Sequence, residues 1–284
     1  MTARAGRTSG STPAFDRARD ESRSVLVGYL PAGFPDVTGG IEVMTAMVEA
    51  GCDVIEVGLP YSDPVMDGPT IQAAAEQALA GGVRTTDVLR TVEAVAATGV
   101  PTLVMTYWNP VEHYGRASGH PEGATGVARF ARDLAAAGGA GLITPDLVPE
   151  EAGEWIAAAD EHDLDKVFLV APSSTDERLA LTTAACRGFV YATAVMGVTG
   201  ARATTSALAG PLVTRVRAVS DLPVGVGLGV STGDQAAEVA SYADAVIVGS
   251  AFVRAVLDAG SDRTAGLAAI RDLTTDLANG VRRA

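Results

Sequence analysis

The sequence is poor in the side chains that many enzymes use for covalent or metal-dependent chemistry. Its 284 residues contain one lysine, Lys166, and three histidines, His113, His120 and His162, although they contain twenty arginines. The two cysteines are too few for a disulfide framework or a four-cysteine metal site. Mechanisms that need an active-site lysine or several histidines on a metal therefore have few candidate residues.

Excess positive charge and long apolar runs are also missing. Thirty-four acids against 21 bases give a net charge of −13, which argues against binding to nucleic acids or anionic membranes. No apolar run approaches the ~18 residues of a membrane span, and residues 1–12 lack the apolar stretch of a secretory signal. We expect a cytoplasmic protein with a disordered tail over residues 1–13.

The rest of the chain alternates between short apolar runs and longer segments with helical periodicity. The runs expected to be strands are 24–29, 53–57, 101–106, 141–144, 166–170, 188–195, 223–226 and 243–248. The expected helices are 14–23, 37–50, 71–79, 86–97, 127–137, 150–162, 176–186, 208–219, 234–240, 251–259 and 264–281. Apolar strands that alternate with helices are typical of a parallel sheet buried on both faces. Eight such units predict an α/β protein with a single (β/α)8 barrel over residues 14–284, preceded by a short extra helix at its N-terminus.

In such a barrel the chemistry lies at the C-terminal ends of the strands, and the second strand carries an acid near that end. Alternation places Ile55 and Val57 toward the helices and Glu56 toward the inside of the barrel. The alternative is a structural role in which the glutamate pairs with an inward arginine, but no strand run contains an arginine. Desolvation should raise the pKa of Glu56 toward neutrality, as suits a general acid and base.

The loop that follows Glu56 carries two more acids. Asp63 precedes Pro64 and is best interpreted as a turn residue. Asp67 stands just before the Gly-Pro-Thr sequence that opens the next helix, so a helix-capping role and a functional role are about equally supported.

Glycines gather at three consecutive strand ends, around residues 197–201, 225–231 and 248–251. Such glycines let backbone N–H groups approach a ligand closely, and the helix N-terminus at Ser250 favours an anion. These features predict a phosphate site like those that follow strands seven and eight in other barrels. Residues 197–206 are rich in Gly, Thr and Ala and have the composition of a mobile lid, with an ordinary surface loop as the alternative.

The stretch Glu56–Gln72 reads EVGLPYSDPVMDGPTIQ and closely resembles the signature of the tryptophan synthase alpha subunit family. The resemblance extends over nearly the whole chain after Ala14. It includes Gly28–Asp36 (GYLPAGFPD), Tyr107–Pro110 (YWNP), Asp146–Glu151 (DLVPEE) and Gly197–Gly200 (GVTG).

This resemblance implies a (β/α)8 barrel that cleaves indole-3-glycerol phosphate reversibly to indole and glyceraldehyde 3-phosphate. Glu56 would move protons at the indole carbon and the glycerol hydroxyl, and Asp67 would hold the indole N–H. The matching substrate-binding positions are Tyr191, Thr199, Gly200, Gly229, Gly249 and Ser250. The family also implies docking on a PLP-dependent beta subunit in an alpha2-beta2 complex.

The chemistry implied by the resemblance agrees with the composition, because indole accepts the electrons of the cleaved bond once its C3 is protonated. Two carboxyl groups then suffice, so we expect no cofactor and no metal. Indole-3-glycerol phosphate synthase, triosephosphate isomerase and the sugar isomerases of histidine synthesis are rivals whose acids, lysine or histidine are not found at these strand ends. A standalone indole-releasing lyase and a mainly allosteric or channelling partner of a beta subunit stay open as alternatives.

Overall fold

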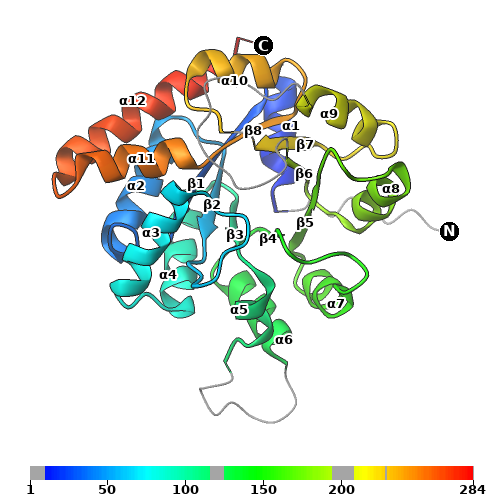
Figure 1. Ribbon diagram of the computed structural model, residues 1–284, viewed down its shortest axis with the longest axis horizontal. Coiled ribbons are helices and arrows are strands. Elements are labelled where there is room, and N and C mark those ends of the chain that lie inside the picture. The colour runs from blue at the N-terminus through cyan, green and yellow to red at the C-terminus, as the bar shows by residue number, and fades with distance from the viewer. Residues whose placement is uncertain (1–9, 116–124, 194–207, 228, 284) are drawn as a thin grey trace.

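The computed structural model describes residues 10–115, 125–193, 208–227 and 229–283. Eight parallel strands follow one another around a closed barrel, in which β1 pairs with both β2 and β8 (Figure 1). They are β1 (Val25–Pro31), β2 (Val54–Gly58), β3 (Thr102–Met105), β4 (Gly141–Thr144), β5 (Asp165–Val170), β6 (Val190–Thr193), β7 (Val224–Gly227) and β8 (Ala245–Val248). The expected (β/α)8 barrel is confirmed, and all eight strands occur where the apolar runs predicted them.

Helices surround the barrel, and their ends lie within three residues of the predicted ones. They are α1 (Thr12–Asp20), α2 (Val37–Ala50), α3 (Pro69–Ala80), α4 (Thr85–Ala96), α6 (Gly126–Ala136), α7 (Gly153–Glu161), α8 (Asp176–Ala185), α9 (Ala209–Arg217), α10 (Gly233–Ala240), α11 (Ser250–Ala259) and α12 (Arg263–Val281). One further short helix, α5 (Trp108–Glu112), was not predicted. Within the described ranges, no helix combines the length and the apolar character needed to cross a membrane.

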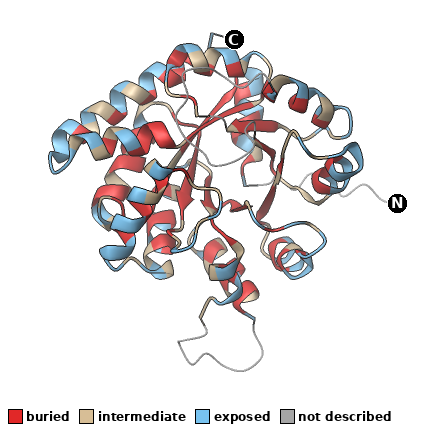
Figure 2. Cartoon of the chain, in the orientation of Figure 1, coloured by how far each residue is buried: buried red, intermediate tan, exposed pale blue. Residues whose placement is uncertain are grey.

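Side-chain alternation along the strands divides the apolar interior into two layers. Ile55 and Val57 of β2 belong to the outer layer between strands and helices, whereas Val54 belongs to the inner layer enclosed by the barrel. Figure 2 shows the buried strands at the centre and helices that are buried on their inner faces and exposed on their outer faces. The predicted inward direction of every second β2 side chain is therefore confirmed.

The N-terminal helix α1 closes the end of the barrel where the strands begin. Ala14 and Phe15 of this helix belong to the inner layer, and the ring of Phe15 lies 5.5 Å from that of Phe189. Just before the helix, the backbone N–H of Ser11 donates a hydrogen bond of 2.9 Å to Asp165, and the Ser11 hydroxyl donates to the same carboxylate.

These contacts correct the expected boundary between tail and domain. The tail was expected to extend to residue 13 and the helix to begin at residue 14, but α1 begins at Thr12 and Ser11 is fully buried. The polar composition of this segment concealed its attachment, because the acceptor for Ser11 comes from a strand 154 residues further along the chain. Residues 1–9 lie outside the described residues.

Three strands begin with or follow an aspartate that is paired with an arginine. Asp53, before β2, accepts hydrogen bonds of 2.7 and 2.9 Å from Arg23. Asp244, before β8, accepts one of 3.0 Å from Arg217, while Arg187 lies 3.9 Å from the Asp165 carboxylate at the start of β5. We call this end of the barrel, where the strands begin, the lower rim; it includes Ser11, α1 and these three pairs.

Candidate active site

Glu56 is the third of the five residues of β2, and its side chain is fully buried. Among the residues that the structure describes, none donates a hydrogen bond to either of its carboxyl oxygens. The alternative of a structural pair with an arginine is therefore not supported in the described part of the chain. Burial raises the pKa of Glu56 from 4.5 to about 8, because the ionised form loses its hydration. Such a group can both give and take a proton near neutral pH.

Two tyrosines lie close to Glu56 at the same end of the barrel. Tyr191 on β6 was predicted as a site residue, and the charge of Glu56 contributes to raising its pKa. Tyr29 on β1 is paired in register with Glu56, and its pKa is raised by burial and then by the charges of Asp67 and Glu56. Both hydroxyls therefore keep their protons at neutral pH and are available as hydrogen-bond donors.

Glycines on neighbouring strands make room for these two rings. A Cβ at Gly58 would collide with the Tyr29 hydroxyl, and a Cβ at Gly227 would lie 2.5 Å from the Tyr191 hydroxyl. Tyr29 was missed as a site residue by the sequence reasoning. The available signal was its alternation with the inward residues Val25 and Val27 at the end of the first strand.

Asp67 lies in the loop between β2 and α3 and is partly buried. Its Oδ1 accepts a hydrogen bond of 3.0 Å from the hydroxyl of Tyr107. Burial raises the pKa of Asp67, and the hydrogen bond from Tyr107 acts in the opposite direction. The N-cap of α3 is Gly68, so Asp67 lies one residue outside the capping position. Since Tyr29 feels the charges of both Asp67 and Glu56, these two predicted acids share one site.

Asp63, by contrast, is exposed, and its carboxylate accepts a hydrogen bond of 2.5 Å from the adjacent Ser62 hydroxyl. This local contact agrees with its interpretation as a turn residue.

The predicted phosphate residues lie at the ends of two adjacent strands. Gly229 follows β7 with a φ of +81°, a backbone conformation that favours glycine. Gly249 is the N-cap of α11, and Ser250 is the first residue of that helix and is buried. A Cβ at Gly249 would lie 3.2 Å from the Tyr29 ring, so this helix N-terminus is next to the carboxyl site. Thr199 and Gly200, with the expected lid, lie outside the described residues.

The side chains that rival mechanisms need are elsewhere. Lys166 is the second residue of β5, at the lower rim, and it forms an ion pair with Asp160. His113 and His162 follow the C-terminal ends of α5 and α7, and His120 lies outside the described residues. Across the described ranges, no group of three or more His, Cys, Asp or Glu side chains is arranged to hold a metal ion.

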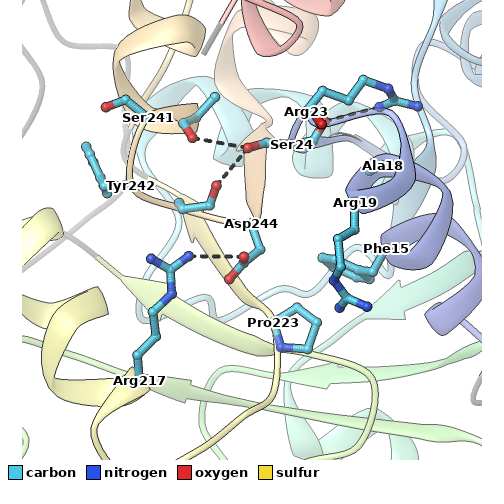
Figure 3. Close-up of a pocket in the computed structure, with 13 residues that line it drawn as sticks. Phe15, Ala18, Arg19, Arg23, Ser24, Arg217, Pro223, Ser241, Tyr242 and Asp244 are labelled. Atoms are coloured by element: carbon cyan, nitrogen blue, oxygen red, sulfur yellow. Dashed lines mark hydrogen bonds and ion pairs between the residues drawn. The ribbon is translucent and has the colours of Figure 1, made fainter.

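A cavity of about 280 Å³, drawn in Figure 3, lies at the lower rim, and neither Glu56 nor Asp67 lines it. Its walls come from α1 and from the residues that precede β1, β7 and β8. Arg217 and Asp244 on its wall form an ion pair, and the Ser24 hydroxyl donates to the carbonyl of Ala243 at 2.7 Å. These polar groups are thus paired within the protein, and we assign the cavity no part in the chemistry.

A buried acid on β2, a second acid in the loop after this strand and a helix N-terminus next to Gly249 form a site of the kind found in (β/α)8-barrel enzymes. Residues 15–282 match the family model of the tryptophan synthase alpha chain. The chain belongs to the tryptophan synthase alpha chain family, whose members cleave indole-3-glycerol phosphate to indole and glyceraldehyde 3-phosphate in tryptophan biosynthesis.

Individual relatives agree over almost the whole chain. The tryptophan synthase alpha chain of Salinispora tropica is 65% identical over 269 residues, which cover 95% of this chain and 96% of that protein. A solved structure of Mycobacterium tuberculosis tryptophan synthase is 58% identical with a TM-score of 0.88, covering 97% of this chain and 99% of that one. The alpha subunit of Legionella pneumophila is 30% identical with a TM-score of 0.82, covering 96% and 98%.

Proposed function

We propose that Glu56 and Asp67 carry the cleavage reaction as proton carrier and charge-stabilising group. The observation that supports this most strongly is a fully buried glutamate that receives no hydrogen bond from the described residues and has a pKa near 8. A carboxyl group in such surroundings destabilises the folded protein, and packing alone does not require it to be there. Groups whose pKa is shifted in this way cluster at functional sites.

In the proposed reaction the Glu56 carboxyl gives its proton to C3 of the indole ring. The ring nitrogen then carries positive charge, which the Asp67 carboxylate opposes at the N–H. Glu56 takes the proton of the adjacent glycerol hydroxyl, the carbon–carbon bond breaks, and its electron pair returns to the ring. Indole and glyceraldehyde 3-phosphate are released with Glu56 protonated again, so one proton enters and one leaves.

The phosphate group of the substrate would bind at the ends of β7 and β8. Gly229, Gly249 and Ser250 supply backbone N–H groups there, and the N-terminus of α11 adds a favourable dipole. Neutral donors of this kind also explain how a chain with a net charge of −13 could hold an anionic substrate. Tyr191 would contact the indole part, and Thr199 and Gly200 would help to close the site.

The chain would work with a PLP-dependent beta subunit, as an alpha2-beta2 complex in the cytoplasm. Support comes from solved structures of Mycobacterium tuberculosis tryptophan synthase, to which this chain is similar. Val65, in the loop after β2, has 70% of its surface exposed and is therefore accessible to a partner that docks on this loop. Indole release by the purified chain, with and without a beta subunit, separates this proposal from a standalone lyase and from a mainly allosteric partner.

The deciding experiment compares wild type with Glu56→Gln in an assay of indole release from indole-3-glycerol phosphate. Glutamine keeps the shape but has no titratable proton, so the variant should bind substrate and lose nearly all turnover. Glu150→Gln is the matched control, because Glu150 is an exposed glutamate paired with Arg178 on the surface. Unchanged turnover in Glu56→Gln would refute the role of proton carrier.

A further inference from the structure

A tyrosine hydroxyl from the segment after β3 forms two hydrogen bonds with the loop that carries Asp67. Tyr107 follows β3 and is the N-cap of α5. Its hydroxyl oxygen accepts a hydrogen bond of 3.0 Å from the backbone N–H of Met66 and donates one of 3.0 Å to Asp67 Oδ1. One side chain thus contacts two consecutive residues of the loop between β2 and α3.

Tyr107 is itself fixed from several directions. Its residue is 6% exposed, and its ring packs against that of Tyr61 with a centroid distance of 5.4 Å. The next residue, Trp108, donates its backbone N–H to both carboxylate oxygens of Asp146 at 2.9 and 3.1 Å. The start of α5 is therefore anchored to the loop after β4, so the hydroxyl is presented from a supported element.

The direction of the hydroxyl proton follows from these contacts. Because the oxygen accepts from the Met66 N–H, its own proton points to Asp67. Burial raises the pKa of Tyr107, so the phenol stays a donor throughout the working pH range. The titratable groups that face Asp67 in the described part of the site are Tyr107 and Tyr29, and both are neutral there.

We propose that Tyr107 is a positioning residue of the reaction, which aims the Asp67 carboxylate at the indole nitrogen and keeps it ionised. This inference rests on the proposed role of Asp67. A carboxylate that must oppose charge as it develops on the ring has to be oriented before the reaction and has to be charged. The Tyr107 hydroxyl meets both requirements. Its hydrogen bond orients the carboxylate, and it favours the charged form because it is stronger to the ionised than to the neutral carboxyl group.

The test is Tyr107→Phe, which keeps the buried ring and removes only the hydroxyl. We expect kcat to fall between about tenfold and a hundredfold while KM changes much less, because the bond matters most in the transition state. The acid limb of the kcat/KM profile should move up by about one pH unit, since the ionised form of Asp67 loses a donor. Tyr114→Phe is the matched control: its hydroxyl also donates to an aspartate, Asp133, at 3.0 Å, on α6 away from the site.

A double-mutant cycle with Asp67→Asn distinguishes this inference from the proposed function. If Tyr107 acts through Asp67, adding Tyr107→Phe to Asp67→Asn should change kcat less than twofold. Full activity of Asp67→Asn would refute the proposed role of Asp67 itself. A large loss in Asp67→Asn together with wild-type kcat and an unmoved acid limb in Tyr107→Phe would overturn the inference alone, as would additive losses in the double variant.

Discussion

Replacing Glu56 by glutamine should stabilise the folded chain, and the gain should grow with pH. In the folded wild type the carboxyl group holds its proton up to about pH 8, whereas in the unfolded chain it releases it above about pH 4.5. Between these values the unfolded state binds fewer protons than the folded state. The contribution of Glu56 to stability is therefore complete below pH 4.5 and is lost as the pH rises toward 8.

The size of the effect follows from the same pKa. Each pH unit within this window lowers the free energy of unfolding of the wild type by about 1.4 kcal/mol relative to a chain without the carboxyl group. Between pH 5 and 7.5 the advantage of Glu56→Gln over wild type should thus increase by about 3 kcal/mol, a large part of the stability of an ordinary domain. Because Glu56 is completely buried, screening by solvent and salt should reduce this difference only slightly.

Urea unfolding, followed by circular dichroism at several pH values from 5 to 8, measures this difference. Glu150→Gln serves again as control, because Arg178 lowers the pKa of Glu150 and its contribution changes only under more acidic conditions. A stability difference between Glu56→Gln and wild type that stays constant over this range would refute the assigned burial and pKa of Glu56.

Four other substitutions test separate parts of the structure. Asp67→Asn should lower kcat by about a hundredfold or more while the melting temperature stays near that of wild type, and a wild-type rate would leave Asp67 only a loop-shaping role. Gly229→Val should raise KM for the phosphorylated substrate strongly, and an equal KM would place the phosphate elsewhere. Gly58→Ala should destabilise by about 1–3 kcal/mol in urea unfolding, and much less in a Tyr29→Ala background, which removes both the hydroxyl and the ring carbons that a Cβ would meet; equal costs in both backgrounds would exclude that collision. Ser11→Ala should cost about 1–2 kcal/mol without changing kcat, and a loss of turnover would contradict its assignment to the lower rim.

The sequence was sufficient for the features that depend on local periodicity. The inward direction of Glu56 followed from strand alternation alone, and the start of α11 at Ser250 followed from the glycines that precede it. The family resemblance favoured a functional role for Asp67 over a capping role and added Tyr191; both residues are found beside Glu56 and Tyr29.

What the sequence did not predict depends on contacts between distant segments. Helix α5 has only five residues and contains Pro110, so its periodicity carries no signal, and its supporting acceptor, Asp146, is 38 residues away. The hydrogen bond from Tyr107 to Asp67 likewise requires the register of β2 against β3. Nothing local to Ser11 indicates that its partner lies at the start of β5.

The stabilising contacts of the lower rim are separate from the reacting groups, and this separation determines where the protein can be made more stable. The lower rim is held together at a distance from the reacting groups by the contacts of Arg23 with Asp53 and of Ser11 with Asp165. Mutations that stabilise the lower rim can offset the destabilising effect of the buried Glu56 carboxyl group without changing catalysis. A library that randomises residues of the lower rim should therefore yield heat-resistant variants with unaltered turnover far more often than one that randomises the residues around Glu56.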